Sequence, residues 1–82
     1  MENQTANMKK PSWEEVDSSM IDAFRYDEAA KLLEVRFHNT GVYRYFEVPV
    51  EVVEGLRQAS SKGSYVQSMI IDAYPTQKGR AK

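Results

Sequence analysis

The sequence predicts an α+β fold in which a three-stranded antiparallel β-meander is followed by two helices packed on the sheet. Apolar and polar residues alternate over residues 33–37, as in a half-buried strand, and Tyr43 and Tyr45 are spaced to share one face of a following strand. A turn signal separates these two segments, and two stretches with apolar residues at helical spacing follow them. The chain has 82 residues, which is enough for one domain with a small core, expected over residues 13–76.

The N-terminal part is expected to supply a leader and the first strand. Residues 1–12 are polar and show no periodicity, which predicts a flexible leader. Trp13 either begins a short helical turn or lies over the core as a lid. Residues 20–26 are then expected to form the first strand, and residues 27–30 the turn that leads into the second.

The centre of the chain predicts a β-hairpin between the second and third strands. Asn39-Thr40-Gly41 suits a three-residue loop whose glycine takes the left-handed conformation. In that register Phe37 pairs with Tyr43, and the rings of Tyr43 and Tyr45 are buried on the core face. A four-residue loop would pair Phe37 with Val42 instead and turn both tyrosines to the other face. The turn chemistry favours the first register.

Two helices are expected after the third strand. Pro49 suits the first turn of a helix that runs to about Ala59. Gly55 lies inside this helix, where glycine is unfavourable, and therefore predicts a close backbone contact with the sheet. The second helix follows a break rich in serine and glycine, and Ser64 and Gln67 fit a capping box at its start.

The charges are unevenly distributed along the chain. Residues 17–76 contain six basic and nine acidic side chains, a net charge of −3, whereas the whole chain carries −1. This acidic balance argues against a strong general nucleic-acid binder, because such binding depends on neutralising phosphates. Residues 77–82 carry Lys78, Arg80 and Lys82 and no acid, and are expected to form a basic flexible tail.

An enzyme is not predicted. His38 is the single histidine, its place beside a turn asparagine is typical of a turn residue, and no nucleophile and base form a recognisable pair. The chain has no cysteine, so neither a disulfide nor a thiolate metal site is expected. No apolar run approaches the roughly 20 residues that span a bilayer. We therefore expect no cofactor, metal, membrane or small-molecule substrate, and a cytoplasmic location.

The order and spacing of several short motifs resemble the KTSC domain over residues 17–76. The motifs are Ser18-Ser19, Tyr26-Asp27, residues 33–37, Tyr43-Arg44-Tyr45, Val48-Pro49, Ser61-Lys62-Gly63 with Tyr65, and Tyr74-Pro75. The resemblance implies a small bacterial or phage-associated domain, which also occurs at the C-termini of some lysyl-tRNA synthetases. It suggests RNA binding and supplies no catalytic residue.

Six residues are candidates for RNA binding: Arg36, Arg44, Lys62, Tyr65, Lys78 and Arg80. Arg36 and Arg44 are expected on one face of neighbouring strands, opposite the tyrosines. There they either contact phosphate or form cross-strand pairs with Glu34. Lys62 either completes an anion site at a helix start or belongs to an ordinary turn.

The tyrosines have two possible roles. Tyr43, Tyr45 and Tyr65 either stack on unpaired bases or fill the core, and the small number of other aromatic residues favours the core. The sequence thus predicts a non-catalytic binding module. The resemblance implies RNA as its partner, either tRNA or single-stranded RNA. The alternative is a protein-interaction module that uses an exposed sheet face or edge.

Overall fold

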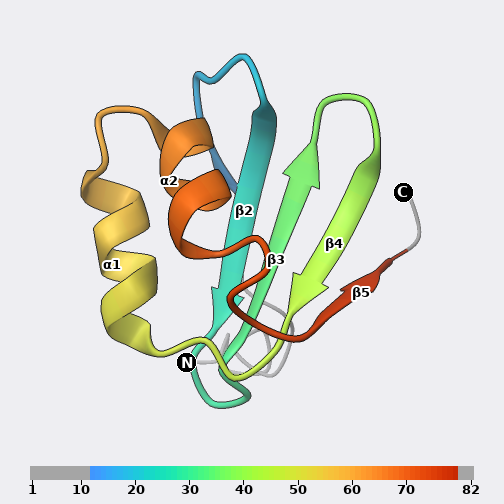
Figure 1. Cartoon of the computed structure of the whole chain (residues 1–82), viewed down its shortest axis with the longest axis vertical. Coiled ribbons are helices and arrows are strands. Elements are labelled where there is room, and N and C mark those ends of the chain that lie inside the picture. Colours follow the sequence, from blue (N-terminus) through green and yellow to red (C-terminus); the bar gives the residue numbers. More distant parts are fainter. Residues whose placement is uncertain (1–11, 80–82) are drawn as a thin grey trace, which may run out of the picture.

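The computed structural model describes residues 12–79 and contains a five-stranded antiparallel sheet and two helices (Figure 1). The strands lie in the order β1-β2-β3-β4-β5. In chain order the elements are β1 (Glu14–Glu15), β2 (Ile21–Asp27), β3 (Leu32–Phe37), β4 (Gly41–Tyr45), α1 (Val50–Gln58), α2 (Lys62–Met69) and β5 (Thr76–Lys78). The α+β class is confirmed, while the predicted number of three strands is too low.

The two additional strands lie at the edges of the sheet. β1 has two residues and pairs with β2, and β5 has three residues and pairs with β4. Both are polar and too short for an alternating pattern to show in the sequence. Gln77 and Lys78, which were expected in a tail, therefore lie in a strand, while residues 80–82 and almost all of the expected leader are outside the described residues.

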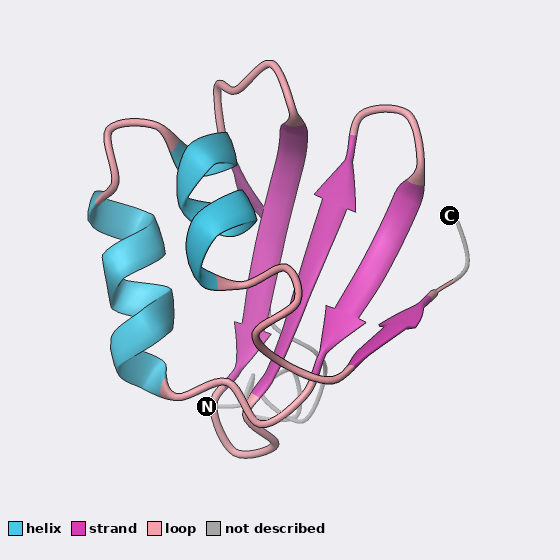
Figure 2. Ribbon diagram, in the orientation of Figure 1, coloured by secondary structure: helices cyan, strands magenta, loops and turns pink. Residues whose placement is uncertain are grey.

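Both helices lie on the same face of the sheet, and the chain then crosses over that face to reach β5 at the far edge (Figures 1 and 2). The core is the layer between this face and the helices. Its fully or nearly fully buried members are Ile21, Phe24, Tyr26, Leu33, Val35, Tyr45, Val48, Val53, Leu56, Val66 and Ile70. The prediction that two helices pack on the sheet is consistent with this arrangement.

The hairpin between β3 and β4 has a different register from either predicted one. Phe37 lies opposite Gly41, and Val35 lies opposite Tyr43, so the loop consists of residues 38–40. Gly41 has a φ of 95°, a conformation that favours glycine, as expected. The observed pairing is shifted by two residues from the favoured register. Because side chains alternate with a period of two, the predicted faces are nonetheless correct.

The tyrosines of the hairpin belong to the core face. Tyr45 is 3% exposed, and the half-buried Tyr43 packs edge-to-face on Phe37, with 5.4 Å between the ring centroids. Tyr26 also points into the core, where its hydroxyl donates to the carbonyl oxygen of Val48 at 2.5 Å. Burial of the rings with a satisfied polar tip is the usual arrangement for tyrosine in a small core.

The break between the helices is shorter than the sequence indicated. α2 begins at Lys62, and Ser61 rather than Ser64 is its N-cap, with its hydroxyl accepting from the Ser64 amide at 3.3 Å. The ammonium group of Lys62 donates to the carbonyl oxygens of Arg57 and Ala59 at 3.1 and 2.9 Å. It thereby satisfies carbonyls at the end of α1, which lets the second helix start only a few residues after the first.

Gly55 makes its close contact with α2 and not with the sheet. A Cβ at this position would lie 2.9 Å from the ring carbon Cζ of Tyr65 and still closer to its hydroxyl oxygen. The Tyr65 hydroxyl donates to the carbonyl oxygen of Val52 at 2.9 Å, which fixes the ring against α1. Glycine is therefore required by the packing of one helix on the other.

We expect Gly55→Ala to destabilise the domain by about 1–3 kcal/mol, the usual cost of overpacking, despite the better helix propensity of alanine. Urea unfolding followed by circular dichroism measures this difference. The matched control is Gln58→Ala, an exposed position of the same helix, which should change stability little. A Gly55→Ala protein more stable than the wild type would contradict the described contact between α1 and Tyr65.

Stability should also fall at alkaline pH because of Tyr45. Burial, followed by the nearby Tyr43 and Asp72, raises the pKa of Tyr45 to about 12. The unfolded chain loses this proton near pH 10, so the folded state binds more protons between pH 10 and 12. Stability is then lost by up to about 1.4 kcal/mol per pH unit as pH rises through this range.

Urea unfolding between about pH 9 and pH 12 tests this pH dependence. Tyr45→Phe keeps the ring and removes the ionisable group, so its stability should fall less steeply. Some slope should remain, because burial also raises the pKa of Tyr26. Equal slopes for the wild type and Tyr45→Phe would show that the Tyr45 hydroxyl is not buried.

Candidate functional site

The face of the sheet opposite the helices carries a group of arginines. Alternation in β2, β3 and β4 turns Phe24, Val35 and Tyr45 toward the helices, and the residues between them toward the other face. Cross-strand pairing then aligns Arg25 with Glu34, and Glu34 with Arg44. Two arginines from the outer strands of this trio thus flank one carboxylate on the middle strand.

Glu34 is the centre of this arrangement. Its two carboxylate oxygens accept from Nε of Arg25 at 2.6 Å and from Nε of Arg44 at 3.1 Å. The Glu34 side chain is 5% exposed, whereas those of Arg25 and Arg44 are 20% and 35% exposed. Arg44 thus forms the cross-strand pair with Glu34 that was one of its two predicted roles. The guanidinium groups of Arg25 and Arg44 nevertheless still reach solvent.

Trp13 lies on this same face. Its ring is 4.2 Å from the guanidinium carbon of Arg25 and 4.8 Å from that of Arg36, both within range of cation–π interactions. Neither predicted role for Trp13 is correct, because the residue directly precedes strand β1 and packs opposite the helix-covered core. Arg36 also donates from Nε to Asp22 at 3.3 Å in an exposed pair.

An ion pair holds β1, and with it Trp13, on the domain. Arg57 of α1 donates to both carboxylate oxygens of Glu14, with the shortest distance 2.7 Å, and to Glu54 at 2.8 Å. The hydrogen bond to Glu14 is the main reason why the pKa of Arg57 lies above its usual value. This contact ties a strand of two residues to a helix 43 positions later in the chain.

A cavity of about 520 Å³ lies on the arginine-bearing face, next to the edge strand β5. Its lining consists of Trp13, Arg25, Glu34, Val42, Arg44, Gln77, Lys78 and Gly79. Gln77 pairs with Arg44 across the two strands, so the amide side chain shares the face of the arginine. The cavity combines an indole ring, two guanidinium groups and a buried carboxylate.

Two of the other predicted binding residues are not brought to this face. Lys62 and Tyr65 belong to α2, where their polar groups bond to backbone carbonyls of the α1 region. Lys78 lines the cavity, but it pairs with Tyr43, and its ammonium nitrogen lies 5.9 Å from that ring on the helix side of the sheet. Arg80 lies outside the described residues. The five predicted residues within 12–79 are therefore divided between this face and the region around α2.

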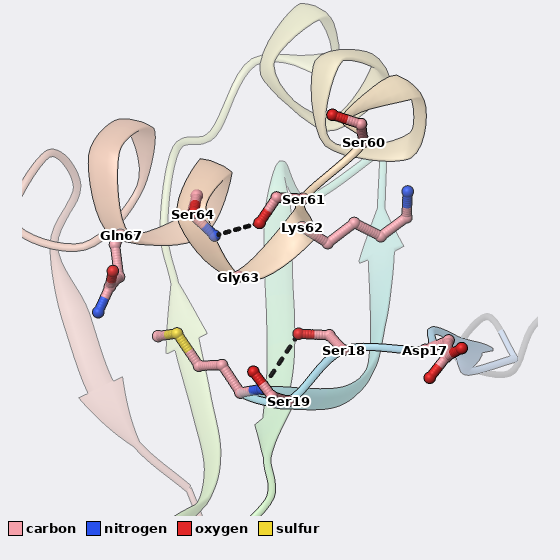
Figure 3. A pocket seen from close by; sticks show the side chains of 10 residues that line it. Asp17, Ser18, Ser19, Ser60, Ser61, Lys62, Gly63, Ser64 and Gln67 are labelled. Atoms are coloured by element: carbon pink, nitrogen blue, oxygen red, sulfur yellow. Dashed lines mark hydrogen bonds between the residues drawn. The ribbon is translucent and has the colours of Figure 1, made fainter.

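The serine-rich cavity around Lys62 is drawn in Figure 3. It has a volume of about 590 Å³ and lies between the segment that precedes β2 and the start of α2. The hydroxyl of Ser18 accepts from the Met20 amide at 3.1 Å, and that of Ser61 caps α2. The Lys62 ammonium binds the end of α1. These groups hold the turn and helix start together, which corresponds to the plainer of the two predicted roles for Lys62.

Sequence reasoning missed Arg25 and Trp13. The signal for Arg25 was present, because it lies between the core residues Phe24 and Tyr26 and so shares the face of Arg36. No comparable signal existed for Trp13, since β1 is too short to show a pattern.

Two further classes of site were searched over residues 12–79. In this stretch no three or more histidine, aspartate and glutamate side chains are grouped to hold a metal ion. None of the helices described there is both long and apolar enough to cross a membrane.

Comparisons with known proteins identify the family. The KTSC domain model matches residues 17–74. A protein from Tsukamurella paurometabola is 42% identical over 55 residues, which cover 67% of this chain and 82% of that protein. A lysine–tRNA ligase from Nostoc sp. is 39% identical over 54 residues, which amount to 66% of this chain and 10% of the ligase.

A solved structure has the same fold. The crystal structure of a KTSC domain protein from Yersinia pestis superimposes with a TM-score of 0.82 at 29% sequence identity, covering 84% of this chain and 97% of that one. The tyrosines, the serine-containing turn and the helix start that carried the resemblance all lie within the matched region. The chain therefore belongs to the KTSC domain family.

Proposed function

We propose that this domain is a non-catalytic binding module that contacts RNA with the sheet face opposite the helices. The observation that carries the proposal is the grouping of Arg25, Arg36 and Arg44 with Trp13 on that face. Cationic groups next to an aromatic ring are the combination used for single-stranded nucleic acid. A cytoplasmic location accords with this role.

The acidic balance of the chain weighs less against RNA when the positions of the charges are considered. Five acids lie in turns or on α1, away from the arginine face: Glu28, Glu47, Glu51, Glu54 and Asp72. On the arginine face, Glu34 and Asp22 form ion pairs with the three arginines, and the alternation also places Glu15 and Asp27 on this side of the sheet. The face is therefore not cationic in sum, and any attraction for phosphate would come from the partly exposed guanidinium groups of Arg25, Arg36 and Arg44.

The relatives give further support. Lysine–tRNA ligases from Nostoc and Trichormus species contain a region similar to this chain, and such enzymes handle tRNA. The similar region makes up only 10% of each ligase, so the ligase activity itself does not extend to this chain. A role as an accessory RNA contact is consistent with such a small appended region.

The protein-interaction alternative has less support. A docking surface for protein is typically marked by an exposed apolar patch. Among residues 12–79, Met69 is the only large hydrophobic residue that is exposed, and its exposed fraction is 48%. The face opposite the helices is charged, and the short β5 at the sheet edge is polar. The alternative therefore rests on that edge, where an added strand would pair with the backbone.

The double variant Arg36→Ala/Arg44→Ala tests the RNA proposal. We expect its affinity for tRNA or a single-stranded RNA to fall roughly tenfold or more, because two phosphate contacts are lost. The slope of log K against log salt should decrease by about 1.4 for single-stranded RNA, or 0.7 per contact. Fluorescence anisotropy of labelled RNA at several salt concentrations measures both quantities.

Lys31→Gln is the matched control, because it removes one exposed positive charge from a turn outside the arginine face. Thermal unfolding should show that the double variant remains folded. RNA affinity unchanged in the folded double variant, or reduced equally by Lys31→Gln, would contradict the role of the arginine face.

A further inference from the structure

We propose that the cavity between Trp13 and β5 holds a single unpaired base of a single-stranded RNA. This inference rests on the proposed RNA-binding function and deepens it, since it names the ligand as an unpaired nucleotide and not a duplex. The volume of about 520 Å³ lies within the roughly 300–1,000 Å³ that is typical of small-molecule sites. A base in this cavity would contact Trp13, Arg25 and Arg44 together.

The lining has the chemistry that unpaired bases require. Single-stranded RNA is recognised by bases that stack on aromatic rings or on the planes of arginine guanidinium groups. Here an indole and a guanidinium are already in contact, with 4.2 Å between the Trp13 centroid and the Arg25 carbon. Gln77 adds an amide, which can both donate to and accept from the edge of a base.

The hydrogen bonds of the two arginines leave donors for a ligand. Arg25 and Arg44 each use Nε to bind Glu34, and their terminal nitrogens form no hydrogen bond with any residue from 12 to 79. A guanidinium group has five N–H donors in a fixed plane, four of them on the terminal nitrogens. Glu34 therefore acts as a positioning residue that fixes both planes while the outer donors remain available.

Stability alone does not account for this arrangement. Glu34 is buried, and a buried carboxylate between two arginines recovers little more than the cost of removing its charge from water. Apolar residues at the same positions would stabilise a sheet face at least as well. The triad instead supplies two oriented cationic planes in a recess, which suits an electron-rich, planar and anionic ligand.

A duplex does not fit the same recess. Bases in A-form RNA are stacked inside the helix, and their edges are reached through a wide, shallow groove or not at all. The recess needs a base that has left its stack. We therefore infer a preference for single-stranded segments, loops or ends over paired RNA.

Trp13 is the only tryptophan of the chain, which makes it a direct reporter. The full chain is titrated with a short single-stranded RNA and with the same sequence annealed to its complement, while tryptophan fluorescence is recorded. We expect the single strand to quench the fluorescence in a saturable manner. The affinity obtained from the titration with the duplex should be at least fivefold lower. Tight duplex binding without a preference for the single strand would overturn the proposal.

Charge-conserving variants separate the base cavity from general attraction to phosphate. Arg25→Lys keeps the positive charge but loses the planar group, and Trp13→Leu loses the ring. Because stacking on one base contributes a factor of roughly 5 to 150 in affinity, each should weaken single-strand binding at least fivefold by anisotropy of labelled RNA. Lys31→Gln, which changes the charge outside the cavity, should have a much smaller effect.

The outcomes distinguish the two proposals. If the wild-type protein binds neither form of RNA, both the proposed function and the cavity are wrong. If it binds single-stranded RNA, but folded Arg25→Lys and Trp13→Leu bind equally well and fluorescence does not change, the function stands and the cavity proposal fails. Thermal unfolding identifies a variant that does not fold, in which case the fluorescence titration of the wild-type chain decides alone.

Discussion

The pairing of β3 with β4 is the constraint on which the rest of the domain depends. Side chains alternate along both strands, so their register decides what each face carries. The observed register directs Tyr43 and Tyr45 toward the helices and places Glu34 next to Arg44 on the other face. A slip of one residue would expose the aromatic rings and bury the charges. Core and candidate site are thus two results of the same backbone pairing.

The sequence predicted the faces of the hairpin but not its register. The period of two in residues 33–37 assigned tyrosines and arginines correctly, since any shift by an even number keeps the faces. The choice between even shifts depends on where the glycine with positive φ falls in the loop. Both predicted registers placed Gly41 inside the loop. In the structure Gly41 is instead the first residue of β4 and lies opposite Phe37. This detail arises from the tertiary pairing of the strands and has no local signal.

Other errors have a similar physical origin. Ser61 and Ser64 are equally good caps by residue type, and the choice depends on Lys62, whose ammonium group binds carbonyls at the end of the preceding helix. Gly55 was correctly recognised as a close-contact position, but its partner is Tyr65 because the two helices pack on each other. Residue types indicated that a contact or a cap was needed, while the choice of partner required the fold.

The candidate site was predictable in part for the same reason. Arg36 and Arg44 were found because they lie in strands with clear alternation, and Arg25 follows the same rule. Lys62 and Tyr65 were nominated by charge, aromatic character or resemblance without a common surface, and the fold places them apart from the arginines, whereas Lys78 lines the same cavity as Arg44. A site on a sheet face is therefore read more reliably from alternation than from a list of basic residues.

The link between Glu14 and Arg57 makes one wall of the cavity sensitive to ionic strength. Trp13 directly precedes the two-residue strand that this exposed ion pair fastens to α1, so screening the pair loosens the ring as well as the strand. Added salt then acts twice, once by weakening attraction to phosphates and once by relaxing the shape of the recess. We expect RNA affinity to fall more steeply with salt than the number of phosphate contacts alone would give. The additional loss arises from loosening of β1 and of the Trp13 ring that precedes it.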